Sequence, residues 1–331
     1  MMSAPLTVAD VEAAQARIAG RVHRTPLLSS HTLGARIGLT GPVWLKAENL
    51  QKTGSFKVRG ALNNIDQLDP EQKARGVITV SAGNHAQAVA WAAAQAGVAA
   101  TVVMAAAASP IKAAATRGYG AEVILHGANN HEAFAEMHRL REERGLTFVH
   151  PFDSATTVAG TGTVGLEILE DLPNLGLGDG AGRDTVVVGI GGGGLSSGLA
   201  FALKSLRPGI RVIGVEPTGA PGMHLALQAG KVVPLTSGTT IADGLAAPFV
   251  GELNLALVRE YVDEVILLED DAILVGARFL LERAKLLAEP AGAAATAALL
   301  TGAVTVDPGA TVVSIVSGGN IDPEKLRLYV A

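Results

Sequence analysis

The chain alternates between short apolar runs and longer segments with helical periodicity. Between the runs, alanine-rich segments space their apolar residues as helices do, among them residues 55–68, 84–96, 111–118, 130–144, 195–206, 271–288 and 290–301. Nine β-branched runs predict strands: VWLKAEN, GVITVSAG, ATVVMA, AEVILHG, LTFVHP, DTVVVGIGG, RVIGVEP, DEVILLED and TVVSIVSGG. Strands that are apolar on both faces and separated by helices are typical of parallel sheets covered on both sides. We therefore predict an α/β fold.

The number of predicted strands indicates two domains, because nine strands are too many for one small sheet. Residues 76–152 contain four or five strand–helix units of their own. We expect this segment to form a small domain inserted into a large one, which would consist of residues 1–75 and 153–331. Before the first strand, a capped amphipathic helix is predicted to begin near Thr7 or Asp10.

Residues 86–111 contain no charged side chain and need a separate interpretation. A membrane-spanning helix would need about 20 strongly apolar residues. This stretch is mostly alanine and is interrupted by polar residues such as Gln87 and Gln95. We interpret it as a buried helix over residues 84–95, followed by a buried strand over residues 100–104.

Charge and composition narrow the classes of partner and chemistry. The 331 residues include 26 Lys and Arg against 31 Asp and Glu, for a formal net charge of −5, and no cysteine. Without a basic patch, the chain does not favour nucleic acid or an anionic membrane as a partner. The missing cysteines exclude disulfides, thiolate metal sites and a cysteine nucleophile. The N-terminal sequence does not resemble a signal peptide, so we expect a soluble, cytoplasmic protein.

The run VVVGIGGGGLSSG, residues 186–198, contains a glycine-rich loop. It contains GxGxxG as Gly189, Gly191 and Gly194, and the next predicted strand ends at the acidic residue Glu216. This is the fingerprint of a dinucleotide site, in which an acid about 20 residues on binds a ribose. Any phosphate on a helix N-terminus needs the same bare backbone amides. The loop alone therefore leaves open whether it binds NAD or another phosphate.

The stretch GSFKVRGA indicates a lysine with unusual chemistry. If Ser55 is the N-cap of a helix, Lys57 lies in the first turn, where the helix dipole disfavours a positive charge. A neutral lysine amine can form a Schiff base with a carbonyl group. Phe56 would offer an aromatic face to a flat ring. The alternative is an exposed helix lysine that forms a salt bridge.

Two further strand ends carry polar groups. In SAGNHAQAVA the chain turns on Gly83 and a helix begins at Asn84, which suits a substrate carboxylate on the helix N-terminus. Asn84 could also bond a phenolic oxygen, and an ordinary helix cap is the alternative. In VVSIVSGGN the hydroxyl of Ser317 could bond a ring nitrogen, or the stretch is a simple strand-to-helix turn. The eight histidines show no metal-ligand spacing.

Taken together, these stretches resemble the fold-type II pyridoxal-phosphate enzymes, and within them the serine/threonine dehydratases (ammonia-lyases) and their serine racemase relatives. The resemblance runs from about residue 8 to the end and is carried, in the family's order, by KTGSFKVRGA, SAGNHAQ, GTGTVGLEILEDL, GGGGLSSG, TIADG and SGGN. It implies two parallel-type α/β domains like those of the tryptophan synthase β subunit. Because the chain ends 11 residues after Asn320, we expect no C-terminal regulatory domain of the biosynthetic threonine dehydratases.

The resemblance also implies roles for single residues. Lys57 would hold pyridoxal 5′-phosphate as a Schiff base and shuttle the Cα proton, with Phe56 on one face of the ring. Asn84 would bond the phenolic oxygen and Ser317 the pyridine nitrogen. The implied phosphate cradle is Gly191, Gly192, Gly193, Gly194 and Leu195. The implied loop for the substrate carboxylate is Ser81, Gly83, Asn84 and His85.

The implied reaction is the elimination of the β-hydroxyl of L-threonine, L-serine or both, which yields a 2-oxo acid and ammonia. Within the family, dehydration of threo-3-hydroxyaspartate or a phenylserine, or racemisation of serine, are alternatives. An NAD-dependent oxidoreductase using the glycine loop and Glu216 is the alternative from another class, but it leaves Lys57 and Ser317 unexplained. A binding protein on an inactive scaffold is a third. A homo-oligomer, dimer or tetramer, is expected from the resemblance.

Three positions depart from the family's pattern. Ala82 stands where racemases carry a second serine that acts on the opposite face, which favours dehydration. Glu216 is present, but Gly222 stands where the racemase-like metal site has an aspartate, so we predict no metal and keep Glu216 as a candidate ligand only. Thr161 replaces the glutamine of AGQGT.

Overall fold

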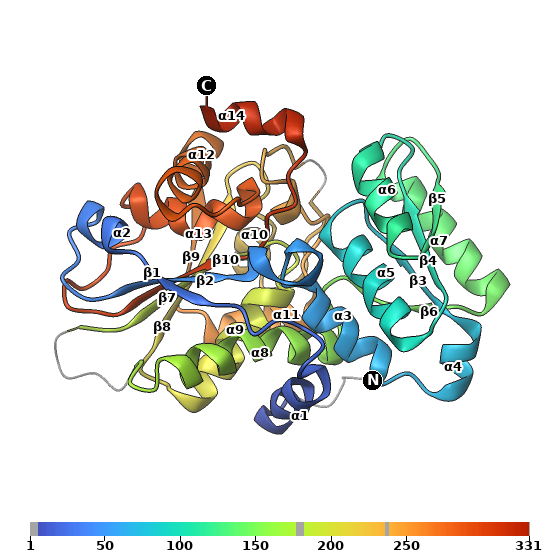
Figure 1. Ribbon diagram of the computed structural model, residues 1–331, viewed down its shortest axis with the longest axis horizontal. Helices are drawn as coiled ribbons and strands as arrows, with labels where there is room; N and C mark the ends of the chain where they lie inside the picture. Colours follow the sequence, from blue (N-terminus) through green and yellow to red (C-terminus); the bar gives the residue numbers. More distant parts are fainter. Residues whose placement is uncertain (1–5, 177–181, 236–237, 331) are drawn as a thin grey trace.

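The computed structural model describes residues 6–176, 182–235 and 238–330, which form two sheets with helices on their faces (Figure 1). The larger sheet has six strands in the order β1-β2-β10-β7-β8-β9, and the smaller has four in the order β5-β4-β3-β6. Neighbouring strands pair in parallel, apart from the antiparallel pair β1–β2. The predicted α/β class with two parallel-type sheets is confirmed.

All nine predicted runs form strands. The larger sheet consists of β1 (Leu27–Ser29), β2 (Val43–Ala47), β7 (Thr185–Gly189), β8 (Arg211–Pro217), β9 (Glu264–Leu268) and β10 (Val312–Val316). The smaller consists of β3 (Val77–Val80), β4 (Ala100–Met104), β5 (Glu122–Leu125) and β6 (Thr147–Phe148). The strand β1 was not predicted, because three residues at a sheet edge are too short to show an apolar pattern.

Helices within residues 76–152 are α5 (Asn84–Ala96), α6 (Pro110–Gly118) and α7 (Asn130–Arg144), and α4 (Pro70–Arg75) comes directly before this segment. The other helices are α1 (Val8–Ile18), α2 (His31–Arg36), α3 (Lys57–Asp66), α8 (Ala155–Asp171), α9 (Gly194–Leu206), α10 (Gly222–Ala229), α11 (Glu252–Tyr261), α12 (Asp270–Phe279), α13 (Pro290–Leu300) and α14 (Arg327–Val330). Short turns of helix are η1 (Glu48–Leu50), η2 (Lys52–Gly54), η3 (Asp243–Leu245), η4 (Leu280–Ala284) and η5 (Pro323–Leu326).

The prediction of one helix over residues 271–288 is wrong. The α-helix α12 ends at Phe279, a π-helical turn follows, and Lys285 has a left-handed backbone with φ 59°. A side chain in this conformation is strained, so the chain cannot continue as an α-helix.

The uncharged stretch of residues 86–111 contains the predicted buried helix and strand, α5 and β4. No helix of the described residues is long and apolar enough to cross a membrane.

Glycines allow three helices of the larger unit, α3, α8 and α9, to pack backbone against backbone. A Cβ atom added to Gly160 of α8 would lie 2.6 Å from the carbonyl oxygen of Arg59 on α3, which is closer than atoms can approach. On the other side of α8, an added Cβ on Gly162 would lie 3.1 Å from the carbonyl oxygen of Gly198 on α9. This close packing fixes the starts of α3 and α9 relative to each other.

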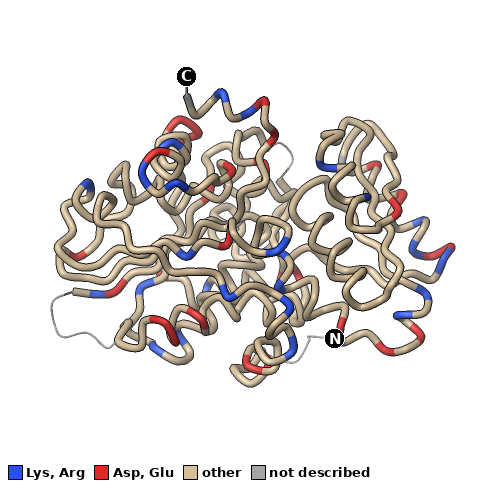
Figure 2. Tube along the Cα trace, viewed as in Figure 1, with Lys and Arg blue, Asp and Glu red and all other residues tan. Residues whose placement is uncertain are grey.

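The two sheets lie side by side, and α3 and α5 run between them (Figure 1). All four strands of the smaller sheet fall within residues 76–152, while the domain limits themselves stay a prediction. Basic and acidic residues, blue and red, occur in both units and are separated by uncharged stretches such as residues 86–111 (Figure 2). Val80, Gly189 and Ser317, at the carboxyl ends of β3, β7 and β10, line one cavity, and this end of parallel strands is where ligands bind in α/β folds.

Candidate active site

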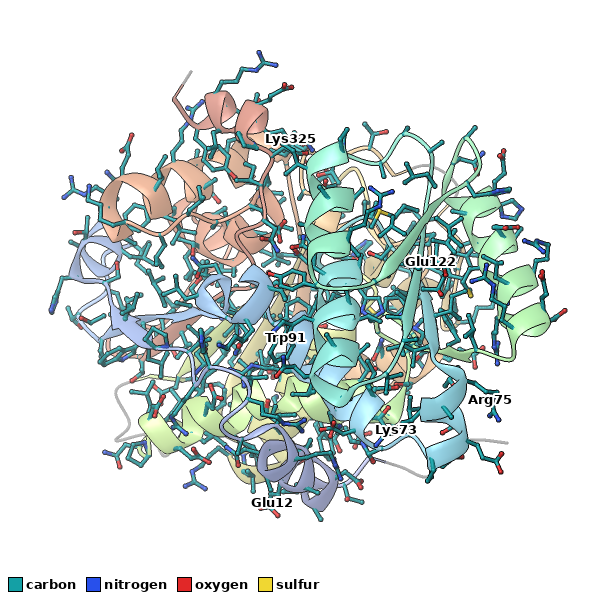
Figure 3. All side chains as sticks on the ribbon, turned by 45° about the vertical axis from the view of Figure 1, so that its right-hand side comes forward. Glu12, Lys73, Arg75, Trp91, Glu122 and Lys325 are labelled. Carbon is teal, nitrogen blue, oxygen red and sulfur yellow. The ribbon has the colours of Figure 1, made fainter. Side chains whose placement is uncertain are left out.

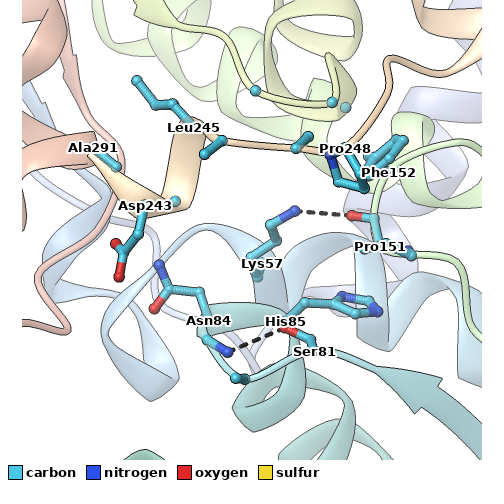
Figure 4. A pocket seen from close by; sticks show the side chains of 18 of the residues that line it. Lys57, Ser81, Asn84, His85, Pro151, Phe152, Asp243, Leu245, Pro248 and Ala291 are labelled. Atoms are coloured by element: carbon cyan, nitrogen blue, oxygen red, sulfur yellow. Dashed lines mark hydrogen bonds between the residues drawn. The ribbon is translucent and has the colours of Figure 1, made fainter. Parts of the chain in front are cut away.

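One cavity of about 550 Å³ lies at these strand ends. It brings together every residue that the sequence analysis assigned to cofactor or substrate: Phe56, Lys57, Ser81, Gly83, Asn84, His85, Gly191, Gly192, Gly193, Gly194, Leu195 and Ser317. These residues come from both sheets, so the cavity is built by the two units together. Figure 4 shows Lys57 pointing across it, with Ser81, Asn84 and His85 on one side.

Lys57 is the first residue of α3 and half-buried in the cavity wall. Its Nζ donates a hydrogen bond to the carbonyl oxygen of Pro151 at 2.9 Å and lies 5.1 Å from the centre of the Phe56 ring. Burial lowers the pKa of Lys57 to about 8, against the opposing attraction of Glu289. The amine therefore loses its proton far more readily than an exposed lysine does.

The predicted reason for this shift needs correction, because Ser55 is not the helix cap. Phe56 occupies the N-cap position, and Ser55 is extended and paired with Gly318 in an antiparallel bridge. The Ser55 hydroxyl is buried and has no hydrogen-bond partner among the described residues. Burial, rather than the helix terminus, is the first cause of the lowered pKa of Lys57.

The glycine loop presents bare backbone to the cavity. A Cβ on Gly192 would lie 2.5 Å from the ring of Phe152, and one on Gly193 would lie 2.7 Å from the Cβ of Asn254. The Asn254 amide donates to the carbonyl oxygen of Gly192 at 2.8 Å, and the Ser197 hydroxyl donates to that of Gly193 at 2.7 Å. Since these carbonyls are bonded away, the N–H groups at the start of α9 remain for an anion.

Asn84 is held in one orientation by two neighbours. The Asn320 amide donates to Oδ1 of Asn84 at 2.8 Å and to the carbonyl oxygen of Thr53 at 2.6 Å. Nδ2 of Asn84 donates to Oε1 of Glu289 at 2.5 Å. These contacts cross the cavity and join α5 of the smaller unit to the segments before α3 and α13.

Glu289 is a site residue that the sequence analysis missed. It lines the cavity, is 4 % exposed, and has a pKa raised to about 7 by burial, with the hydrogen bond from Asn84 opposing the shift. It is the N-cap of α13, directly before Pro290. A single acid inside the apolar stretch of residues 286–300 was the signal that could have found it.

The loop of residues 81–85 has a local structure that suits an anion. The Ser81 hydroxyl accepts a hydrogen bond from the N–H of Gly83 at 3.2 Å, and α5 begins without a side-chain cap. His85 is buried, which lowers its pKa to about 3, and its Nε2 lies 3.1 Å from the carbonyl oxygen of Val149. Because that oxygen only accepts, Nε2 of the neutral ring carries the proton.

Aromatic rings form a second part of the wall that was not predicted. Phe134, Phe152 and Phe249 line the cavity, and the last two have ring centres 5.5 Å apart. The ring of His150 is 4.7 Å from that of Phe152, and burial lowers the pKa of His150 to about 4. This part of the cavity is therefore apolar and holds a neutral histidine. The HPFD sequence at the end of a predicted strand was the available signal.

Glu216 does not line this cavity. Its side chain is fully buried at the end of β8, and its carboxylate accepts hydrogen bonds from the N–H groups of Met223 and His224 at 2.7 and 2.8 Å. Burial raises its pKa to about 7, and these two bonds oppose the shift. The ribose role required by the oxidoreductase alternative has no support in this geometry. Among the described residues, no three His, Asp or Glu side chains gather as a metal site.

The departure at Thr161 has a physical explanation. Its hydroxyl lies 2.6 Å from the carbonyl oxygen of Gly194 and 3.0 Å from that of Val158. Gly194 is the first residue of α9 and the last of the glycine loop. Thr161 therefore ties α8 to the loop through a short side chain.

A lysine of lowered pKa and a glycine loop in one cavity between two α/β units are what an enzyme with a phosphate-bearing carbonyl cofactor needs. The comparisons with known proteins agree. Residues 18–318 match the model of the pyridoxal-phosphate dependent enzymes, and the chain belongs to this family.

Named relatives and solved structures cover almost the whole chain. The L-threonine ammonia-lyase of Geobacter sulfurreducens is 46 % identical over 97 % of this chain and 77 % of its own length. The catabolic L-threonine dehydratase of Staphylococcus aureus is 44 % identical over 96 % of this chain and 90 % of its own. Maize serine racemase has a TM-score of 0.90 at 40 % identity, covering 99 % of this chain and 97 % of that one. The threonine deaminase of T.th. has a TM-score of 0.87 at 42 % identity, covering 96 % of this chain and 99 % of that one.

Proposed function

We propose that this chain is a threonine ammonia-lyase, which eliminates the β-hydroxyl of L-threonine, and of L-serine, to give a 2-oxo acid and ammonia. The observation that carries the proposal is the Lys57 amine, which has a lowered pKa and shares one cavity with the glycine loop, Asn84 and Ser317. Two relatives that are 44–46 % identical bear the names of threonine ammonia-lyase and threonine dehydratase.

The residues present fit pyridoxal 5′-phosphate. Lys57 would bond its aldehyde carbon, and Gly191–Gly194 with Leu195 would hold the phosphate through backbone N–H groups; the neighbours of these glycines leave no room for side chains. Phe56 would cover one face of the ring. Ser317 lines the cavity and is only 6 % exposed, so its hydroxyl is available to the ring nitrogen. Asn84, whose amide donates one N–H to Glu289, would donate the other to the phenolic oxygen.

When bound, pyridoxal phosphate withdraws electrons from the Cα atom of an attached amino acid. Lys57 would act as the general base that takes the Cα proton, and its lowered pKa keeps a useful fraction of the amine neutral. Ser317 does not hold a pyridine nitrogen protonated as a carboxylate does. This makes the ring a milder electron sink, which suits loss of a β-hydroxyl more than a long-lived carbanion.

The substrate carboxylate would bind at the N-terminus of α5. Ser81 and Gly83 shape the turn, and the first N–H groups of the helix, at Asn84 and His85, would donate to the anion. The His85 ring is neutral and bonded to Val149, so it contributes no charge. Recognition here would come from backbone donors and the helix dipole.

We propose dehydration rather than racemisation because Ala82 lines the cavity where the racemases carry a serine. A methyl group neither gives nor takes a proton, so only Lys57 would act at Cα. An Ala82→Ser variant is expected to convert L-serine to D-serine faster than the natural chain, measured by chiral chromatography. Equal D-serine formation by both would contradict this explanation.

The domain organisation, oligomeric state and location are also proposed. We infer a large unit of residues 1–75 and 153–331 with residues 76–152 as the small inserted unit, and a cytoplasmic homo-oligomer, dimer or tetramer. Exposed apolar side chains such as Leu50 and Leu287 support association of copies. Light scattering on the purified chain tests the oligomer, and a monomer at working concentration would contradict it.

The experiment that tests the function is release of 2-oxo acid from a panel of β-hydroxy amino acids, with both enantiomers of each. We expect turnover of L-threonine and L-serine, no turnover by Lys57→Ala, and little of the D-enantiomers. Inactivity on threonine together with turnover of threo-3-hydroxyaspartate or a phenylserine would overturn the substrate. Binding of the cofactor without release from any substrate would overturn the enzyme.

A further inference from the structure

The buried carboxylate of Glu216 lies where the family resemblance implies a divalent cation. Such a cation would need free carboxylate oxygens and a second acid, and the resemblance places that acid at position 222, which is glycine. Both oxygens of Glu216 instead face N–H donors, from Met223 at 2.7 Å and His224 at 2.8 Å. The N–H donors direct positive charge at the two carboxylate oxygens, as a cation would, and they occupy the position that a cation would need. The residues present do not fit a cation.

The two donors are the second and third residues of α10, which begins at Gly222. The N-cap residue of this helix is Pro221, which has no polar side chain and makes no side-chain cap bond. Glu216 supplies the missing cap from the end of β8, across a turn in the chain. A carboxylate at this end of a helix also interacts favourably with the helix dipole.

The cap connects to the glycine loop through one side chain. A Cβ added to Gly193 would lie 2.9 Å from Cε of Met223, so the Met223 side chain packs directly under the loop. Met223 is fully buried, and its N–H is one of the two that Glu216 accepts. The position of the loop therefore depends on where Glu216 holds the start of α10.

We infer that Glu216 is a positioning residue: its bonds to the N–H groups of α10 take the place of a bound cation, fix Met223 under the glycine loop, and make the protein independent of divalent metals. This goes beyond the proposed function, because it concerns how the loop is held and not which substrate is consumed.

The first test needs no activity. The melting temperature of the full chain, with and without pyridoxal phosphate, is measured after treatment with EDTA and after addition of Mg²⁺, Mn²⁺ or Ca²⁺. We expect EDTA and the added ions to leave the temperature unchanged, both for the cofactor-free protein and for the protein with pyridoxal phosphate. A fall with EDTA that one of these ions restores would overturn the inference, whatever the substrate of the enzyme proves to be.

The second test uses Glu216→Ala, with Glu12→Gln on the exposed face of α1 as the matched control. We expect Glu216→Ala to lower the melting temperature by about 5 °C or more and to weaken pyridoxal phosphate binding about tenfold, while the control changes neither. Met223→Ala should weaken binding in the same direction.

The binding measurement separates positioning from general stability. A lower melting temperature with unchanged cofactor affinity would contradict the role of Glu216 toward the loop. A melting temperature equal to that of the control would contradict the cap itself. If the Glu216→Ala variant does not fold, the EDTA measurement still tests independence of metals, and Met223→Ala still tests the contact with the glycine loop.

Discussion

The two sides of α3 differ in how their buried charged groups are paired. Residues 57 and 59 are about 200° apart around the helix, so their side chains leave it in opposite directions. Arg59 is fully buried among Glu48, Glu167 and Lys46, and both glutamates bond its guanidinium through both of their oxygens at 2.7–2.9 Å. Lys46 completes the group with a 2.6 Å bond to Glu167.

On the cavity side, the charged groups have few partners. Nζ of Lys57 has one neutral carbonyl partner, and Glu289 has one amide donor. Burial accordingly moves their pKa values, lowering that of Lys57 to about 8 and raising that of Glu289 to about 7. In the ion-pair group, Arg59 outweighs the effect of burial on Glu48 and holds its pKa below the usual value.

The difference teaches how one helix can serve both stability and chemistry. The paired side keeps fixed charges and anchors α3 to β2 and α8. The cavity side keeps groups that exchange protons near neutral pH, which is what acid–base catalysis needs. Variants on the cavity side should therefore lose activity, and variants on the paired side should lose stability.

Lys57→Ala removes the reactive amine and should abolish function without harming the fold. We expect the rate of 2-oxo acid release to fall by more than about 10³-fold, and the visible absorbance of bound cofactor to disappear. The melting temperature of the cofactor-free protein should not fall, because a poorly paired buried amine is removed. A large fall would mean that the cavity side is structural after all.

Arg59→Met tests the paired side. It leaves Glu48 buried without its main partner, so we expect a loss of about 3–5 kcal/mol in the free energy of unfolding, measured with denaturant. The matched control is Arg139→Met, which breaks exposed ion pairs with Glu136 and Glu143 on α7 and should change stability little. If Arg59→Met and Arg139→Met lowered the free energy of unfolding equally, the proposed difference between the two sides of α3 would be contradicted.

Glu289→Gln tests the pH dependence of the cavity side. A folded-state pKa of about 7 against 4.5 means that the folded protein holds a proton that the unfolded chain has lost between these values. Natural stability should therefore fall as pH rises from 4.5 to 7, by up to about 3 kcal/mol from this group. The variant, which keeps an oxygen for Asn84, should lose that part of the slope. If the curves of unfolding free energy against pH for the natural protein and the variant ran parallel, the raised pKa of Glu289 would be contradicted.

Asn320→Ala removes the contact that orients Asn84. One neutral hydrogen bond is worth about 1 kcal/mol, so we expect kcat/KM to fall about 3–10-fold and the absorbance of the bound cofactor to shift. Asn320→Asp can still accept a bond but no longer donates to Oδ1 of Asn84, and should behave like Asn320→Ala. Natural kinetics together with an unshifted absorbance in both variants would contradict the role of Asn320.

The sequence predicted the sheets better than the helices. Runs such as those of β7 and β10 are apolar throughout because helices cover both faces, so their pattern is unmistakable. The longest helix, α8, was not among the segments predicted to be helical. Its Gly160, Gly162 and Gly165 weaken a helical signal, but they are needed where α3 and α9 approach its backbone.

In the site, the sequence predicted the residues of the motifs, but it did not predict the residues that surround and position them. Lys57, Asn84, Ser317 and the glycine loop stand at strand ends in recognisable stretches. Glu289 and the aromatic wall act through contacts between segments far apart in the chain; the bond from Asn84 to Glu289, for example, spans 205 positions. Such pairings depend on the packed structure and leave almost no local signal.

Lys325, beside α6 in Figure 3, also makes a contact that the sequence could not predict. Its Nζ lies 3.5 Å from the carboxylate of Asp243, as does that of Lys112 on α6, so one acid joins two lysines at the cavity wall. The three residues are distant in sequence, and each alone reads as an ordinary surface charge.

The most direct test of the central claim is to locate the cofactor on the chain. The purified holoenzyme is treated with borohydride, which fixes a lysine-bound carbonyl cofactor by reduction, and is then digested for mass spectrometry. We predict the added mass of reduced pyridoxal phosphate on the peptide that contains Lys57 and on no other. Modification of a different lysine, such as Lys112, or of none, would contradict the account.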